Sequence, residues 1–174
     1  MRLVFLTLLG ILWACENNTD QTDGRRPIEP LFACEAGFAG PYACLGIDLM
    51  GQLSLEELDA TSGNDCWGWT DPATGKEYAI MGLNNGTAFV DITEANNPVY
   101  LGKLPTQTIA SVWRDIKVYQ QYALIVADRA ENHGVQVFDL TRLRNINTPT
   151  IFDADAHFDG LGSAHNIAVN QTSG

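Results

Sequence analysis

Positive charge and known catalytic motifs are both scarce in this sequence. Lysine and arginine total 10 against 21 aspartates and glutamates, which gives a formal net charge of −11. Because nucleic acid is a polyanion, so acidic a chain is not expected to bind it. The sequence also lacks GxSxG, HExxH and glycine-rich phosphate-binding patterns, so no catalytic motif indicates an enzyme. Hydrophobic residues make up 45% and charged residues 18%, as expected for a globular protein.

Long hydrophobic runs are missing as well. The apolar run at residues 3–13 is too short to span a bilayer as a stable helix, and we interpret residues 1–15 as a secretory signal. Its end, LWAC, resembles a bacterial lipobox, in which Cys15 becomes the lipidated first residue. The alternative is an ordinary signal peptide cut nearby. Residues 16–32 suit a polar tether, so we expect a lipid-anchored outer-membrane or cell-surface protein, or an extracellular one.

Cysteine is limited to four residues, and no pair has the CxxC spacing of a zinc ribbon or a thioredoxin-like site. Cys34 and Cys44 flank a short loop with glycine and proline. In an oxidising compartment they are expected to form a disulfide that stabilises the fold by about 2–3 kcal/mol. The alternative is two reduced, buried thiols. Cys66 is left over and could be a reactive thiol, but we expect a small buried hydrophobe.

The sequence pattern of the chain changes at residue 64. Residues 33–63 hold the predicted disulfide loop and a short helix, because Ser54 and Glu57 have the spacing of a capping box. From residue 64 onward, apolar runs of five to eight residues alternate with clusters of Gly, Pro, Asn and Asp. This alternation is typical of many short strands.

A ten-residue pattern occurs twice in this second part. NNGTAFVDIT begins at Asn84 and NHGVQVFDLT begins at Asn132, an offset of 48 residues. Trp69 and Trp113 each precede a tyrosine by nine residues, so we align these tryptophans. Proline-led segments, PVYLGKLPT and PTIFDAD, are expected to close the two copies. The strand WRDIKV at 113–118 returns as AHNIAV at 164–169, so the repeat unit is 44–51 residues long.

A repeated unit of about four short strands predicts an all-β, β-propeller-like fold of four-stranded blades. The blades are expected at about 64–106, 107–155 and 162–174, so residues 64–174 form two blades plus the start of a third. Such an incomplete propeller would leave strand edges open. We therefore expect the chain to be a fragment of a longer protein, or to pair with another copy.

Four small or polar residues of the repeat have predicted backbone roles. Gly86 and Gly134 occur where a hairpin needs positive φ or a close approach of backbone. Asp91 and Asp139 are each followed by an aliphatic residue and threonine, so their carboxylates are expected to accept hydrogen bonds from nearby amides at the strand ends.

Several segments, in the same order, resemble the choice-of-anchor B family of secreted bacterial proteins and the wider group of LVIVD repeats. They include ACEAGFAGPYACLGIDLM, NDCWGWTDPATGKEYAIMGLNNGTAFVDIT, HGVQVFDLTRLR and DADAHFDGLGSAHNI. The resemblance covers residues 33–170. It implies an exported, β-propeller-like protein of roughly twice this length or more, and it supplies no catalytic residues.

The three histidines all fall between residues 133 and 165. Asp155, His157, Asp159 and His165 could supply ligands to a metal such as Ca²⁺. The alternative is an inter-blade loop whose polar side chains satisfy backbone groups and each other. Arg114 and Asp115 could line a central funnel, but we expect a buried Arg–Asp pair at the blade junction. We expect three tryptophans to pack between blades rather than to form a platform for stacking sugars: Trp67, Trp69 and Trp113.

These observations leave two functional hypotheses. The first is a binding or scaffold module that recognises an extracellular protein, glycan or peptide through loops on one face. The second is a propeller-type hydrolase or lyase in which His157, Asp159 and His165 converge, with or without a metal ion. The fold alone supports either hypothesis, because propellers host many functions.

Overall fold

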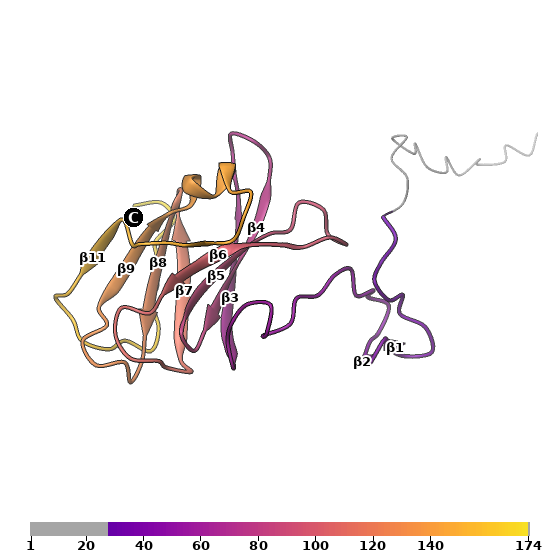
Figure 1. Cartoon of the computed structure of the whole chain (residues 1–174), viewed down its shortest axis with the longest axis horizontal. Coiled ribbons are helices and arrows are strands. Elements are labelled where there is room, and N and C mark those ends of the chain that lie inside the picture. The colour runs from indigo at the N-terminus through magenta and orange to yellow at the C-terminus, as the bar shows by residue number, and fades with distance from the viewer. Residues whose placement is uncertain (1–27, 174) are drawn as a thin grey trace, which may run out of the picture.

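The structure is a computed structural model that describes residues 28–173. The predicted signal segment, Cys15 and residues 16–27 of the tether lie outside the described residues. Between residues 28 and 173 the chain is built of strands, with a short 3-10 helix as its helical element (Figure 1). None of this part of the chain forms a helix with the length and hydropathy needed to span a bilayer.

Two larger sheets each correspond to one copy of the repeat. The first sheet contains β3 (Gly63–Thr70), β4 (Glu77–Leu83), β5 (Gly86–Asp91) and β6 (Val99–Pro105), joined at its far edge by β10 (Thr150–Ile151). The second contains β7 (Arg114–Tyr119), β8 (Tyr122–Ala127), β9 (Val135–Asp139) and β11 (Ala156–Phe158). The 3-10 helix η1 (Leu140–Asn145) follows β9. The all-β prediction is confirmed, and neither sheet closes on itself.

The hydrophobic core lies mainly between the two sheets. Phe89 on β5 stacks on Phe138 on β9, with ring centroids 4.4 Å apart, and Phe152 packs edge-on against both. A smaller apolar cluster covers the opposite face of the first sheet, where Leu58 packs beside Ala88 and Val90. The first sheet is therefore covered on both faces.

The strand that closes the second copy differs from the prediction. The segment 149–155 was expected to close the second sheet, but β10 pairs in parallel with β6 of the first sheet. Instead β11, further along the chain, pairs with β9. A Cβ at Gly102 would lie 2.0 Å from the Thr150 oxygen, so glycine at that position permits the close contact with β10. The third copy, at 164–169, forms no strand.

The predicted backbone roles of glycine and aspartate are confirmed. Gly134 has φ of 64°, and a Cβ there would lie 2.2 Å from the Phe158 oxygen. At Gly86, a Cβ would lie 2.4 Å from the oxygen of Leu104. The Asp91 carboxylate accepts a 3.0 Å hydrogen bond from the Thr93 amide, and Asp139 accepts an equivalent one from Thr141.

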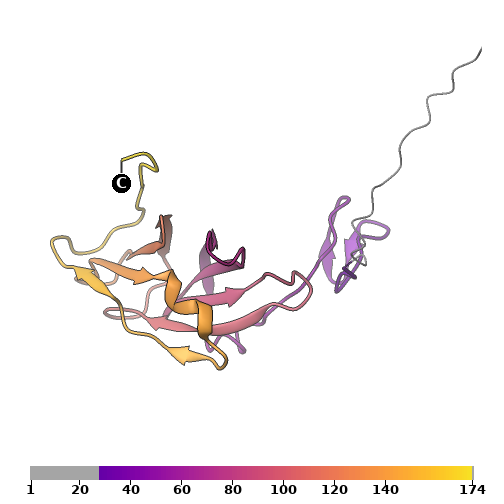
Figure 2. The same cartoon turned by 90° about the horizontal axis from the view of Figure 1, so that it is seen from above.

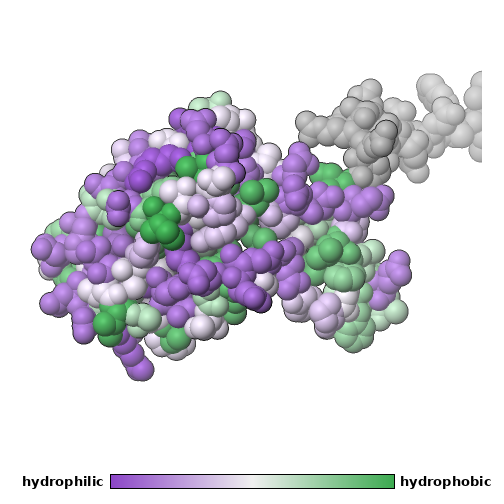
Figure 3. All heavy atoms as spheres, in the orientation of Figure 1, coloured by the Kyte–Doolittle hydropathy of each residue, from purple (hydrophilic) through white to green (hydrophobic). Residues whose placement is uncertain are grey.

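The N-terminal segment forms a small hairpin that stands apart from the two sheets (Figures 1 and 2). It contains β1 (Phe38–Ala39) and β2 (Tyr42–Ala43), and the predicted Cys34–Cys44 disulfide is present with an S–S distance of 1.96 Å. Hydrophobic side chains gather on this hairpin (Figure 3), including Leu45, which is 94% exposed.

Two local predictions need correction. Ser54 and Glu57 do form the reciprocal hydrogen bonds of a capping box, but the residues after them make only a turn, because Asp59 adopts a left-handed conformation with φ of 48°. Cys66 is free and exposed rather than buried. It lies on β3, an edge strand, on the face opposite Trp67, so the second sheet does not cover it.

Candidate functional site

A groove of about 770 Å³ opens between the two sheets at the end where η1 lies. Its walls come from the end of β3, the β7–β8 turn and η1, so both copies of the repeat contribute. The side chains that give it its chemistry are Trp67, Trp69, Val118, Gln120, Gln121 and Arg144. Ligand sites in proteins commonly have volumes of roughly 300–1,000 Å³, so this groove has the size of one.

Trp67 and Trp69 give the groove an aromatic wall. Trp69 is buried and stacks on Tyr78, with ring centroids 5.5 Å apart. Trp67 is 40% exposed, and the Lys117 ammonium lies 4.6 Å from its ring centroid. This cation–π contact favours the observed orientation of the indole. The expectation that the tryptophans pack between the sheets is therefore confirmed for Trp69 and confirmed only in part for Trp67, which contacts Lys117 of the second sheet but remains 40% exposed.

The alignment of Trp69 with Trp113 is also wrong. Trp69 pairs with Tyr78, whereas the residue that pairs with Tyr122 is Tyr119. Loop length explains the error, because six residues separate β3 from β4 and only two separate β7 from β8. Trp113 lies just before β7, 43% exposed, at the opposite end of the sheet from the groove.

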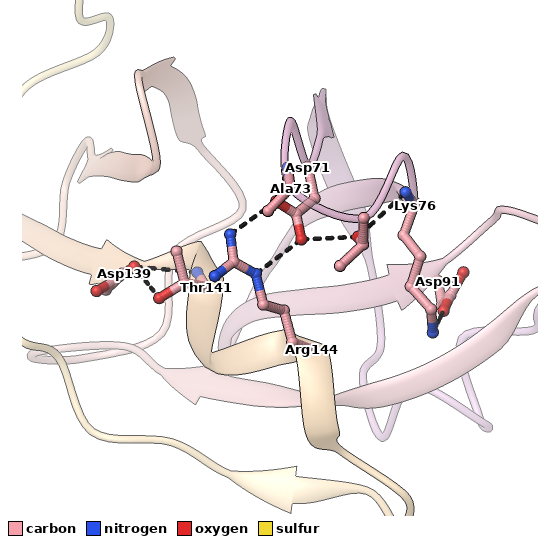
Figure 4. Close-up of polar contacts among 8 residues, drawn as sticks. Asp71, Ala73, Lys76, Asp91, Asp139, Thr141 and Arg144 are labelled. Atoms are coloured by element: carbon pink, nitrogen blue, oxygen red, sulfur yellow. Dashed lines mark hydrogen bonds and ion pairs between the residues drawn. The ribbon is translucent and has the colours of Figure 1, made fainter.

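An ion pair lies beside the groove and joins the two copies of the repeat (Figure 4). Arg144 on η1 donates two hydrogen bonds of 2.7 Å to the buried carboxylate of Asp71, in the β3–β4 turn. Asp71 also accepts from the Ala73 amide and the Thr74 hydroxyl. The hydrogen bonds from Arg144 hold the pKa of Asp71 well below its usual range. Sequence reasoning missed this pair, since Asp71 had the appearance of an ordinary turn residue.

Three side-chain amides lie along the rim of the groove. Gln171 donates a 2.9 Å hydrogen bond to the Val118 carbonyl. The amides of Gln120 and Gln121, in the β7–β8 turn, have no hydrogen-bond partner within residues 28–173. Each amide has two donors and an acceptor oxygen, so these two side chains can bind a polar ligand without giving up a bond to another residue.

A second, smaller pocket of about 290 Å³ lies at the opposite end of the sheets. Its lining comes from three successive copies of the repeat, at residues 64–65, 113–115 and 165–166. The Asp65 carboxylate accepts a 2.9 Å hydrogen bond from the Ile116 amide, and the Asp115 carboxylate accepts a 2.7 Å bond from the Ile167 amide. Each copy thus contacts the next through the same bond.

Arg114 is a buried residue of this pocket's lining, and within residues 28–173 it pairs with no carboxylate. Its guanidinium donates to the Leu83 carbonyl at 3.0 Å, to the Thr106 hydroxyl at 2.8 Å and to the Nε2 atom of His133 at 3.0 Å. Since arginine only donates, His133 is neutral, with the proton on Nδ1 directed at the Gly134 carbonyl. Burial lowers the pKa of Arg114 to about 10 and also lowers the pKa of His133.

The expected Arg114–Asp115 pair is wrong. These neighbours lie on opposite faces of β7, because side chains alternate along a strand. The Asp115 carboxylate instead lies 2.5 Å from the Lys117 ammonium, on its own face of the sheet. Burial opposes ionisation of Asp115, but hydrogen bonds from Lys117 and the Ile167 amide prevail and lower its pKa.

The four candidate metal ligands are not brought together. Asp155 is bound to Arg142 at 2.9 Å, His157 donates to the His133 carbonyl, and His165 lies 3.1 Å from Asp128. Across residues 28–173, no three His, Cys, Asp or Glu side chains, Asp159 included, are placed to hold a metal ion. The separate partners of His157 and His165 likewise give no support to a catalytic cluster with Asp159.

Comparison with known proteins adds no assignment: no family model, curated protein or solved structure matches this chain.

Proposed function

We propose that this chain is an exported, surface-associated binding or scaffold protein whose sheets stack as in a β-propeller. The observation that carries the proposal is the repeated carboxylate–amide bond, from Asp65 to Ile116 and from Asp115 to Ile167. A bond that recurs in the same place between successive copies indicates a stack with constant geometry, as in a repeat protein.

The exposure of equivalent residues supports further stacking. Ile80 and Phe89 pair across β4 and β5, face the second sheet and are fully buried. Their equivalents in the second copy, Leu124 and Val137, also pair with each other but are only half-buried. A further sheet placed on the second as the second is placed on the first would cover them.

Export is supported by the disulfide and by the sequence of the N-terminus. Disulfides persist in oxidising compartments, and Cys34–Cys44 is consistent with an extracellular location. The lipobox-like LWAC motif would place Cys15 on a membrane through a lipid anchor. The resemblance to the choice-of-anchor B and LVIVD proteins fits the same proposal, and an extracellular glycan or protein is the expected class of ligand.

The export part of the proposal is tested by expressing the full chain in a bacterium with an outer membrane, fed with radiolabelled palmitate. We expect label on the wild-type protein, none on Cys15→Ser, and access of external antibody to the wild-type protein on intact cells. A wild-type protein that stays unlabelled and in the cytoplasm would contradict it.

A further inference from the structure

The groove between the sheets indicates which class of ligand the protein binds. This inference rests on the binding function proposed above. We infer that this groove binds a neutral saccharide, with the sugar against the indole of Trp67 and its hydroxyl groups bonded to the amides of Gln120 and Gln121.

Among the residues that the structure describes, the groove offers a ligand no charged side chain that lacks an ion-pair partner. Arg144 is the charged residue of its lining, and that guanidinium is already held in two hydrogen bonds by Asp71. Lys117, which contacts Trp67 from the side of β7, is held by Asp115. An anionic or cationic ligand would find no uncompensated partner, so a neutral one is favoured.

The aromatic wall of the groove suits a sugar ring. A sugar ring presents apolar C–H groups on its faces and hydroxyls at its edge, and an exposed indole offers a flat apolar surface of matching size. Trp67 remains 40% exposed, while Lys117 contacts its ring and its neighbour Trp69 is buried. An indole held in place before binding loses little conformational freedom when the ligand arrives.

The side-chain amides of the β7–β8 turn suit the hydroxyl groups of a sugar. Gln120 and Gln121 line the same groove as the two indoles and lack partners within residues 28–173. An amide donates and accepts at neighbouring atoms, which suits the vicinal hydroxyls of a sugar. The hairpin turn that carries both residues is short and joins two paired strands, so their positions are well defined.

The test is a titration of the full chain, kept in detergent, with hexasaccharides of glucose, mannose, galactose and N-acetylglucosamine. Binding is followed by the indole N–H resonances in a two-dimensional NMR spectrum. A polygalacturonate hexamer is the charged comparison, and a random decapeptide library is the non-sugar comparison. Trp67→Ala and Gln121→Ala remove groove contacts, and Trp113→Ala is the matched control, since Trp113 is equally exposed but lies at the other end of the sheet.

We expect at least one neutral hexasaccharide to shift the Trp67 resonance. Trp67→Ala is expected to weaken that binding by about tenfold or more, while Trp113→Ala leaves it unchanged. If the Trp67→Ala variant does not fold, the saccharide affinities of Trp67→Phe and Gln121→Ala are measured instead. Each is expected to be lower than that of the wild type, by less than about tenfold. Equal weakening by Trp113→Ala would overturn the assignment of the groove.

The remaining outcomes test the saccharide inference and the binding function separately. Binding of peptides or of the charged hexamer at Trp67, with no neutral sugar bound, overturns the saccharide inference but leaves a binding module. A folded chain that binds no member of either set overturns the saccharide inference and leaves a folded protein as the ligand class of the proposed binding function.

Discussion

The carboxylate of Asp71 and the guanidinium of Arg144 are 73 residues apart in the chain and are joined by two hydrogen bonds of 2.7 Å. Asp71 is fully buried and its partner Arg144 is 33% exposed, whereas in the nearby Lys76–Asp91 pair the carboxylate is 15% exposed and the lysine 44%. The two ion pairs in Figure 4 therefore lie close together, and their carboxylates differ in exposure to water.

Asp71→Asn is expected to lower the midpoint of thermal unfolding far more than Asp91→Asn. In Asp71→Asn the carboxylate charge is lost, and a buried NH₂ group faces a guanidinium that can only donate. Asp91→Asn removes the carboxylate partner of Lys76, whose side chain is 44% exposed, and should cost less than about 1 kcal/mol. Circular dichroism melts of the wild type and both variants measure the difference, and equal midpoints for the two variants would show that the Asp71 pair contributes no more to stability than the Asp91 pair does.

Gly134→Ala and Gly75→Ala form a second matched pair. Both glycines have positive φ, 64° and 73°, but a Cβ at Gly75 meets nothing within 4 Å whereas one at Gly134 would lie 2.2 Å from the Phe158 oxygen. We expect a cost of about 1 kcal/mol at Gly75 from backbone strain and about 2–4 kcal/mol at Gly134, where β11 must also move. Urea unfolding gives both values, and similar costs would contradict the close approach.

Stability is expected to fall as the pH drops below about 6.5, the ordinary pKa of histidine. Burial, the Arg114 guanidinium and His157 all lower the pKa of His133 in the folded state. The unfolded chain therefore binds a proton at a higher pH than the folded one does, so acid favours unfolding. This contribution is fully present above the unfolded pKa and is lost as the pH falls through the lower, folded pKa.

The measurement is the free energy of unfolding between pH 7.5 and pH 5 for the wild type and for His133→Gln. Glutamine retains an acceptor for Arg114 but does not titrate, so we expect a shallower decline. Identical slopes for the two proteins would assign the acid sensitivity to other groups.

Asp115→Ala is expected to speed hydrogen exchange at the Ile167 amide by about tenfold or more, because a charge-assisted hydrogen bond is lost. Asp65→Ala should do the same for the amide of Ile116. Lys117→Met is the control for Asp115, since it removes the cation but leaves the carboxylate on Ile167. Unchanged exchange in both alanine variants would remove the main support for stacked repeats.

Local chemistry made part of this structure predictable. Gly134 and Asp139 occupy the expected places because turn geometry and strand ends depend on a few neighbouring residues. The same holds for the Cys34–Cys44 disulfide, which closes a short loop. The two copies of the repeat share one register, as their aligned sequences would suggest, since Tyr78 pairs with Asp91 and Tyr122 with Asp139.

Contacts between distant segments were not predictable in this way. No sequence pattern links Asp71 to Arg144, because the contact depends on how one sheet lies against the other. The misalignment of Trp69 and Trp113 has a similar origin, since a six-residue loop and a two-residue turn changed the spacing without changing the sheet. The groove at Trp67 depends on the same packing of one sheet against the other, so the sequence did not predict it.

The parallel pairing of β10 with β6 has a consequence for the order of folding during export. In a chain exported N-terminus first, as proposed above, the first sheet cannot acquire its fifth strand until residues 150–151 have crossed the membrane, after β7, β8 and β9. Until then β6 is an open edge that could pair with another chain. The two repeats should therefore complete their folding together.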